Sequence, residues 1–487
     1  MKEAKQHSVA YNFLMNFILS ASQFIFPLIT FPYISRVLLA EGSGKITFAS
    51  SVANYFLMVA SLGIPTYGIR ACAQVRDDKR QLSKTVHELL FINLTTTVLV
   101  TVTYAICVLS IPRFRTDETL FLINGINIVL NMFGMNWLFQ AMEQYDYITA
   151  RSLIFKIVSV LLMILLVHQK SDYIIYGAIT VFAAVGSNVL NFVRSRQYIE
   201  YRWLGNYHIG RHIKPILILF AQSLAVSIYT NLDTVMLGFM KTDVDVGYYN
   251  AAVKIKGILL SLVSSLGGVL LPRMSYYAKE NLKTKFMETM SMALNFTMLI
   301  SLPLAVYFSM FSAECIQFLA GDGYFGAIAA MRIITIAVVP NGLTGILGVQ
   351  VLTAIEKEKY VLYSVIVGAV LDFALNILLI PQFGAMGAAL ATTIAEFAVL
   401  AIQLLYTRNL MCQIRSQLKW KSYILLSAIA AIFGCLTQMF QIKSTFLELV
   451  VSAFTFFCIY GVGLLVAKDS FAMEAVKWGK TKLRRIR

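Results

Sequence analysis

The chain has 487 residues, of which 58% are hydrophobic and 14% charged, with a net charge of +16 and a mean hydropathy of +0.71. A soluble protein carries about a quarter charged residues, so this composition excludes an ordinary soluble enzyme and indicates a membrane protein. The positive charge does not indicate a nucleic-acid partner, because the basic residues lie in short gaps between apolar stretches rather than on one soluble module.

About fourteen apolar stretches follow one another along the chain. Each is long enough, at about 1.5 Å per residue, to cross a ~30 Å hydrocarbon core as a helix. We predict spans at 11–35, 46–67, 89–111, 119–141, 152–168, 173–193, 215–239, 247–271, 288–312, 324–354, 360–380, 384–407, 422–441 and 445–467. The connections are too short for a soluble domain, so the sequence predicts an all-α polytopic membrane protein. An even number of spans places both termini on one side.

Basic residues are concentrated in every second gap between these stretches and at both termini. Only ten of the 41 fall elsewhere: Arg36, Lys45, Arg113, Arg115, Lys170, Lys241, Lys254, Lys256, Arg332 and Lys443. Cationic loops stay on the cytoplasmic face, so both termini are predicted to be cytoplasmic. The tail 468–487 mixes basic with apolar residues and is expected to lie on the inner leaflet, with membrane lipid as its partner.

A faint internal repeat relates the first pair of spans to the seventh and eighth. In each pair a glycine, Gly44 or Gly247, restarts the second helix, and a proline, Pro65 or Pro272, follows near its end. The second copy begins six spans after the first, which predicts two six-helix lobes related by an axis along the membrane normal. The expected divisions are an N-terminal lobe at 1–210, a C-terminal lobe at 211–410, two further helices at 411–467 and the tail at 468–487.

Ionisable residues inside a membrane are costly and usually face a wet cavity or each other. The deep ones lie mostly in the second half: Asp233, Lys254, Lys256, Arg332, Asp372 and Glu396. Arg36 is predicted at the outer mouth of the first span. One interpretation pairs them internally, for example Asp233 with Lys254. The other is a cavity in which Arg36, Lys254 and Arg332 bind an anionic group such as a pyrophosphate, with forked arginine donors.

The sequence contains no nucleophile–base set, phosphate-binding loop or metal cluster. His208 and His212 have the spacing of a helical metal pair, but they lie in a basic, glycine-containing loop. We therefore expect neither an enzyme nor a protein with a metal or other cofactor. The prolines Pro27, Pro32 and Pro303 interrupt predicted spans, as does the segment 340–342, and such breaks suit helices that bend during transport.

Five segments resemble the Wzx-type oligosaccharide-lipid flippases of the multidrug/oligosaccharidyl-lipid/polysaccharide exporter superfamily. They are Phe31–Ala49, Trp137–Ile157, Asn231–Gly257, Gly267–Ser275 and Leu371–Glu396. The resemblance implies a V-shaped arrangement of two six-helix lobes around a central cavity, with the last two helices outside. It also implies a bacterial inner-membrane protein that flips undecaprenyl-pyrophosphate-linked oligosaccharide repeat units from the inner to the outer leaflet by alternating access. The pathway would be capsule, exopolysaccharide or O-antigen-like biosynthesis, with a polymerase and glycosyltransferases as partners.

In relatives of this family an arginine of the first helix points into the cavity, and Arg36, within Ser35–Leu38, occupies the matching place. A second cavity arginine follows a Tyr-Tyr pair, and here Lys254 lies slightly beyond the matching place. Two alternatives on the same scaffold stay open: a lipid II-type flippase and a cation-coupled multidrug exporter. In the exporter, the carboxylates Asp233, Asp372 and Glu396 would be ion-coupling sites.

Overall fold

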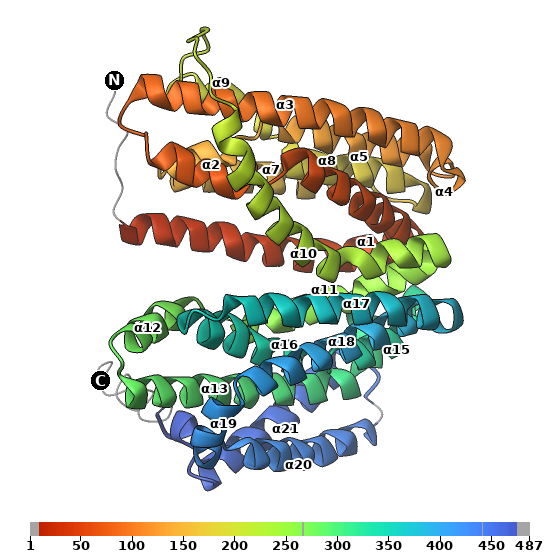
Figure 1. The fold of residues 1–487 in the computed structure, drawn as a ribbon. Coiled ribbons are helices and arrows are strands. Elements are labelled where there is room, and N and C mark those ends of the chain that lie inside the picture. The colour runs from red at the N-terminus through yellow and green to blue at the C-terminus, as the bar shows by residue number, and fades with distance from the viewer. Residues whose placement is uncertain (1–8, 265–266, 441, 475–487) are drawn as a thin grey trace, which may run out of the picture. The chain divides into compact units, whose positions relative to one another are not determined.

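The computed structural model describes residues 9–264, 267–440 and 442–474, and every regular element in these ranges is a helix. The predicted all-helical fold is therefore confirmed (Figure 1). Eleven helices of the described part are long and apolar enough to cross a membrane. The expected number of fourteen spans stays a prediction. The chain forms two compact units, Met1–Gly247 and Tyr248–Arg487.

The first unit contains the elements α1 (Val9–Ser61), α2 (Ile64–Ala73), α3 (Lys79–Ser110), α4 (Pro112–Arg115), α5 (Glu118–Asn131), α6 (Asn136–Ala141), α7 (Tyr145–Leu166), η1 (Lys170–Asp172), α8 (Tyr173–Val185), α9 (Asn188–Ser195) and α10 (Gly210–Met240). α1 is two helices joined at Leu39, whose φ of 56° and ψ of −173° are not helical. This break separates the first two predicted spans. α3 begins at a capped end, where the Asp78 carboxylate accepts hydrogen bonds from the Arg80 and Gln81 backbone amides.

α1 lies at the centre of this unit and packs against α3, α5, α7, α8 and α10. α10 also packs against α2, and α2 packs against α6. A cluster of buried apolar side chains, including Ile64, Leu89 and Trp137, joins α2, α6 and α10 to α3. Gly68 makes this packing close, because a Cβ there would lie 2.8 Å from the Trp137 indole ring.

A buried carboxylate ties the connection before α10 to α3. Glu88 has a fully buried side chain and accepts hydrogen bonds from Arg211 at 2.6 Å and from the His208 backbone amide at 2.6 Å. His212 lies 2.8 Å from the same carboxylate, and its other ring nitrogen lies 2.8 Å from the Tyr67 hydroxyl. The two histidines of the candidate metal spacing thus serve to anchor this segment.

The helix α11 (Asp243–Val263) begins in the first unit and continues into the second. The second unit then contains α12 (Gly267–Lys279), α13 (Lys283–Met310), α14 (Ser312–Ala320), η3 (Asp322–Tyr324), α15 (Ala327–Ile334), α16 (Val338–Thr344), the π-helix η4 (Gly345–Leu352), α17 (Glu358–Phe383), α18 (Ala385–Tyr406), α19 (Arg408–Ile414), η5 (Arg415–Gln417), α20 (Trp420–Gln438) and α21 (Thr445–Val466).

Two hairpins organise the second unit. α17 turns into α18 at Gly384, whose φ of 54° suits a residue without a side chain, and α20 packs against α21. α13 contacts α16 and α20. The overlong span predicted at 324–354 is divided into α15, α16 and η4, and a π-helical segment of this kind often marks a functional site.

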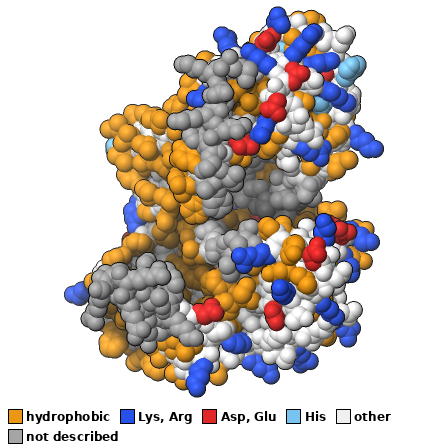
Figure 2. Space-filling view, turned by 90° about the vertical axis from the view of Figure 1, so that its left-hand side faces the viewer, with side chains coloured by type: hydrophobic (Ala, Val, Ile, Leu, Met, Phe, Trp, Pro, Cys, Tyr) orange, Lys and Arg blue, Asp and Glu red, His pale blue; other side chains and the backbone are white. Residues whose placement is uncertain are grey.

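The surface separates apolar from basic side chains, as expected of a protein that spans a membrane. Large apolar residues such as Leu99, Leu165 and Leu378 are more than 60% exposed. Figure 2 shows a dense group of Lys and Arg side chains on the first unit, with others scattered over the rest of the face in view. Its exposed basic residues include Lys79, Arg80, Arg196, Arg202, Arg211 and Lys214.

The sequence-based divisions at residues 210, 410 and 467 stay predictions. Residues 475–487 of the predicted interfacial tail lie outside the described residues. Of the described beginning of this tail, Asp469 is buried. Its carboxylate contacts Lys419 at 3.2 Å and accepts a hydrogen bond from Tyr423.

Candidate functional site

In the second unit, the structure brings one predicted carboxylate together with a neighbouring cation. Glu396 on α18 is 3% exposed, and its carboxylate lies 3.5 Å from the Lys256 Nζ of α11. Asn341, beside the proline of α16, donates a hydrogen bond of 2.7 Å to the same carboxylate oxygen. Three helices therefore meet at Glu396. The Lys256 side chain is only 12% exposed.

The other predicted residues of the second unit have different surroundings. Lys254 on α11 is half-buried, and Arg332 on α15 is exposed, with its Nε 3.4 Å from the Ser312 hydroxyl. Asp372 on α17 is 1% exposed and accepts a hydrogen bond of 3.2 Å from Asn376, one turn along the same helix. Asp372 and Glu396 are both in the apolar interior of this unit, whereas the Arg332 side chain is accessible.

The first unit contains Arg36 and Asp233. Arg36 is exposed on α1, and its guanidinium donates a hydrogen bond of 2.6 Å to the Pro32 carbonyl, so the side chain folds back along its own helix. Asp233 on α10 is 4% exposed and interacts electrostatically with Tyr55 of α1. Because Asp233 and Lys254 belong to different units, their predicted pairing stays a prediction.

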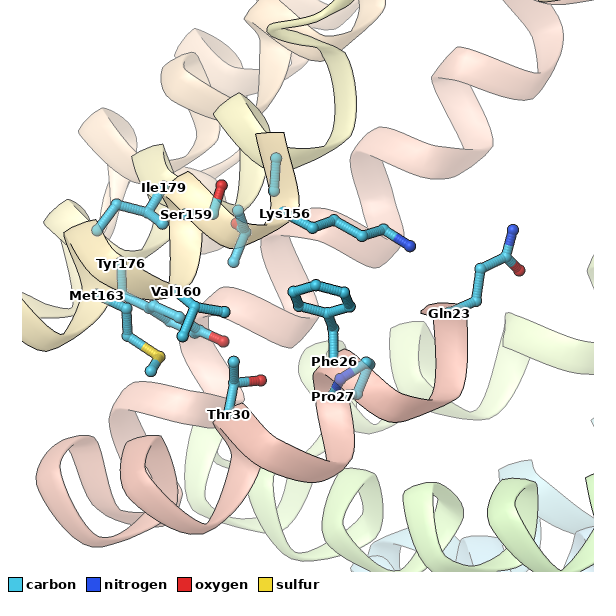
Figure 3. A pocket seen from close by; sticks show the side chains of 12 residues that line it. Gln23, Phe26, Pro27, Thr30, Lys156, Ser159, Val160, Met163, Tyr176 and Ile179 are labelled. Atoms are coloured by element: carbon cyan, nitrogen blue, oxygen red, sulfur yellow. The ribbon is translucent and has the colours of Figure 1, made fainter. Parts of the chain in front are cut away.

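A pocket of about 290 Å³ lies among α1, α7 and α8 of the first unit (Figure 3). Its walls are mostly apolar, and Lys156 of α7 is the charged residue among its lining side chains. The ammonium lies 5.6 Å from the centre of the Phe26 ring and donates a hydrogen bond of 2.8 Å to Ser22. Across the pocket, Tyr176 forms a hydrogen bond with Thr30. In the described part of the chain no carboxylate forms an ion pair with Lys156.

Such a pocket suits an apolar group that carries one anionic or hydrogen-bond-accepting atom. Sequence reasoning did not predict this pocket. A weak signal was present, because Pro27 lies within α1 between the polar residues Gln23 and Thr30.

Solved structures with the same fold are membrane transporters. The lipid II flippase MurJ in an inward closed conformation superposes with a TM-score of 0.74 at 14% identity, covering 94% of this chain and 99% of that one. An inward-facing multidrug resistance transporter of the MATE family gives a TM-score of 0.59 at 13% identity, covering 81% of this chain and 99% of that one. These similarities define the class: an all-helical protein with the multidrug and lipid exporter fold.

Sequence comparison assigns the chain more narrowly. It belongs to the polysaccharide biosynthesis protein family, which matches residues 9–278, and the MatE family matches residues 219–378. A putative O-antigen transporter of Escherichia coli K12 is 24% identical over 404 residues, covering 82% of this chain and 97% of that protein. A probable low-salt glycan biosynthesis flippase of Haloferax volcanii is 23% identical over 209 residues, covering 42% of this chain and 44% of that protein.

Proposed function

We propose that this protein flips undecaprenyl-pyrophosphate-linked oligosaccharide repeat units from the inner to the outer leaflet of a bacterial cytoplasmic membrane. The observation that carries the proposal is the agreement of fold and family. The fold is shared with a lipid II flippase over 94% of the chain, and a relative aligned over 97% of its own length is described as a putative O-antigen transporter. Both termini lie in the cytoplasm in this proposal.

The proposed substrate consists of a polyprenyl chain, a pyrophosphate and an oligosaccharide. We assign the binding of its pyrophosphate to the cations Arg36, Lys254 and Arg332. Ionisable residues within a membrane protein often mark the path of a charged substrate, and a pyrophosphate complements cations. The exposure of Arg36 and Arg332 supports this assignment, because accessible guanidinium groups can form paired hydrogen bonds to phosphate oxygens. Lys254 offers a compact point charge.

Deleting the gene tests this function in the organism that carries it. We expect lipid-linked repeat units to accumulate on the cytoplasmic leaflet while their synthesis continues, as measured by leaflet-specific labelling and by mass spectrometry of extracted lipids. A deletion strain that stops making the repeat unit would indicate an enzyme of synthesis. A strain that exports glycan normally but becomes sensitive to cationic drugs would favour the multidrug exporter.

The partners of the pathway belong to the same proposal. A polymerase must join the repeat units after they reach the outer leaflet, and glycosyltransferases must assemble them on the inner one. Co-purification of the tagged protein with either class of enzyme from detergent-solubilised membranes would test direct contact. Normal flipping by the purified protein in liposomes would show that such contact is not required.

A further inference from the structure

Two interrupted helices of the first unit meet at one polar cavity. α1 ends at Ser61 and the chain resumes as α2 at Ile64, with Leu62 at a φ of 47°. α5 ends at Asn131 and resumes as α6 at Asn136, with Met135 at a φ of 40°. Positive φ is strained for a residue other than glycine, and such residues cluster at ligand sites. Both breaks line the same cavity of about 190 Å³.

Neighbouring side chains satisfy the carbonyl groups that these breaks expose. Thr96 donates a hydrogen bond of 2.7 Å to the Ala60 carbonyl, at the end of α1. At the other break, Asn188 donates to the Leu130 carbonyl at 3.2 Å, and Asn191 donates to the Gly134 carbonyl. These side-chain hydrogen bonds stabilise the two helix breaks, so the cavity between the breaks is formed by the fold itself.

The lining presents amide groups and carries no charged side chain. Its polar side chains are Ser61, Asn93, Asn131, Asn136 and Gln140, and Trp137 supplies the indole. The absence of charge in this lining disfavours a phosphate or a carboxylate as the ligand. Amide groups beside an indole and an aliphatic wall suit a group that has both hydroxyl oxygens and apolar C–H faces.

The side-chain oxygens of Asn93 and Asn136 both accept hydrogen bonds from neighbouring residues. The Asn93 oxygen accepts a hydrogen bond of 3.3 Å from Thr97, and the Asn136 oxygen accepts hydrogen bonds from Arg151 at 2.9 Å and Asn191 at 3.1 Å. Within the described residues, the NH₂ groups of Asn93 and Asn136 have no hydrogen-bond acceptor, and the Gln140 amide has no partner. Asn93 is only 5% exposed. Amide groups that line a cavity and have no acceptor among the described side chains can donate hydrogen bonds to a ligand.

We propose that this amide pocket, between the α1–α2 and α5–α6 breaks, binds one uncharged sugar unit of the lipid-linked oligosaccharide. The inference rests on the proposed function and adds to it a subsite for the glycan, separate from the cations assigned to the pyrophosphate. The volume of about 190 Å³ is below the roughly 300–1,000 Å³ of pockets for drug-sized ligands, so it admits a single ring rather than the whole repeat unit.

The experiment compares two lipids on the full-length protein in lipid nanodiscs. One is the undecaprenyl-pyrophosphate-linked oligosaccharide extracted from the host membrane, and the other is undecaprenyl pyrophosphate without sugar. Dissociation constants are measured for wild type, Asn93→Leu and Gln140→Leu. Asn127→Leu is the matched control, because Asn127 lies on α5 outside the lining. Thermal unfolding of each variant is recorded in the same nanodiscs, and using two variants keeps the test valid if Asn93→Leu does not fold.

We expect wild type to bind the glycosylated lipid more tightly than the sugar-free lipid. Each pocket variant should weaken binding of the glycosylated lipid by about five- to tenfold, the effect of one lost hydrogen bond, with unchanged binding of the sugar-free lipid. The control should match wild type for both lipids. Unchanged binding of the glycosylated lipid, or an equal loss for both lipids, would overturn the sugar pocket while leaving the flippase proposal intact. Failure of wild type to bind either lipid would instead refute the flippase proposal.

Discussion

The Glu396 carboxylate lies 3.5 Å from the Lys256 ammonium and accepts a hydrogen bond from Asn341. The sequence placed Glu396 among the deep ionisable residues, and its role there stays a prediction. It could not identify Lys256 as the neighbour of Glu396, because the two residues are far apart in sequence. The arrangement favours a role for this pair in joining α11 to α18, beside the proline-containing α16.

Removing one partner of this pair should destabilise the protein. Lys256→Met and Glu396→Gln each leave a buried polar or charged group without its partner, at a cost of about 3–5 kcal/mol. The double variant Lys256→Met/Glu396→Leu should recover most of the thermal stability, measured by unfolding in detergent, and also recover transport. A stable double variant that no longer transports would instead assign Glu396 to ion coupling.

Neutralising the residues proposed to bind the pyrophosphate should reduce transport without reducing stability. Arg36→Ala, Lys254→Ala and Arg332→Ala should each reduce flipping in liposomes by about tenfold or more, the effect of losing a charge-assisted hydrogen bond. Their insertion and stability should stay near wild type. Arginine-to-lysine changes should retain less activity than Lys254→Arg, because the fork of guanidinium donors is lost.

The control for this series is Lys285→Ala, an exposed lysine near the start of α13. It should leave both abundance and flipping unchanged. If Lys254→Ala lowers abundance and a second change at Asp233 restores it, these two residues form an internal pair, and Lys254 does not bind substrate.

At the scale of elements, the two glycines of the sequence repeat lie where α1 and α11 pack closely. Gly44 and Gly247, the glycines expected to restart corresponding helices, face each other in the first unit. A Cβ on Gly44 would overlap the Asp243 carbonyl, and a Cβ on Gly247 would overlap the Ala40 carbonyl. Each glycine therefore permits backbone-to-backbone approach at this crossing.

An alanine at either position should separate these helices. Gly44→Ala and Gly247→Ala are each expected to lower the free energy of unfolding by about 1–3 kcal/mol, the usual cost of overpacking. The measurement is the fraction of monodisperse protein that survives heating in detergent. Gly257→Ala on α11 is the control, because a Cβ there meets no atom within 4 Å. Equal behaviour of all three variants would contradict the close crossing.

At the scale of the whole molecule, the alternation of basic residues predicts the orientation in the membrane. Reporter fusions after Arg76 and Arg202 should report cytoplasm, and fusions after Lys241 and Lys443 should report the outside, because cationic loops are retained on the inner face. Alkaline phosphatase and green fluorescent protein fusions give opposite signals in the two compartments. The same compartment for Arg202 and Lys241 would show that α10 does not cross the membrane.

The sequence by itself determined that this protein is an all-helical membrane protein and located most of its long apolar helices. Most predicted spans fall on one helix or on two consecutive helices, and the span at 324–354 falls on α15, α16 and η4. This success has a local cause: a helix satisfies its backbone hydrogen bonds within itself, so hydropathy and length are sufficient to locate it. The family resemblance likewise follows from the sequence alone.

Only the tertiary structure decided where helices break inside a span and which polar side chains meet. The break at Met135 depends on a segment distant in sequence. Asn188 donates a hydrogen bond to the Leu130 carbonyl and Asn191 donates one to the Gly134 carbonyl, which stabilises the turn. The Lys156 pocket, the amide pocket and the Lys256–Glu396 pair are likewise formed by helices distant in sequence. Hydropathy is a property of each segment, whereas these contacts depend on how segments pack, so no local pattern could specify them.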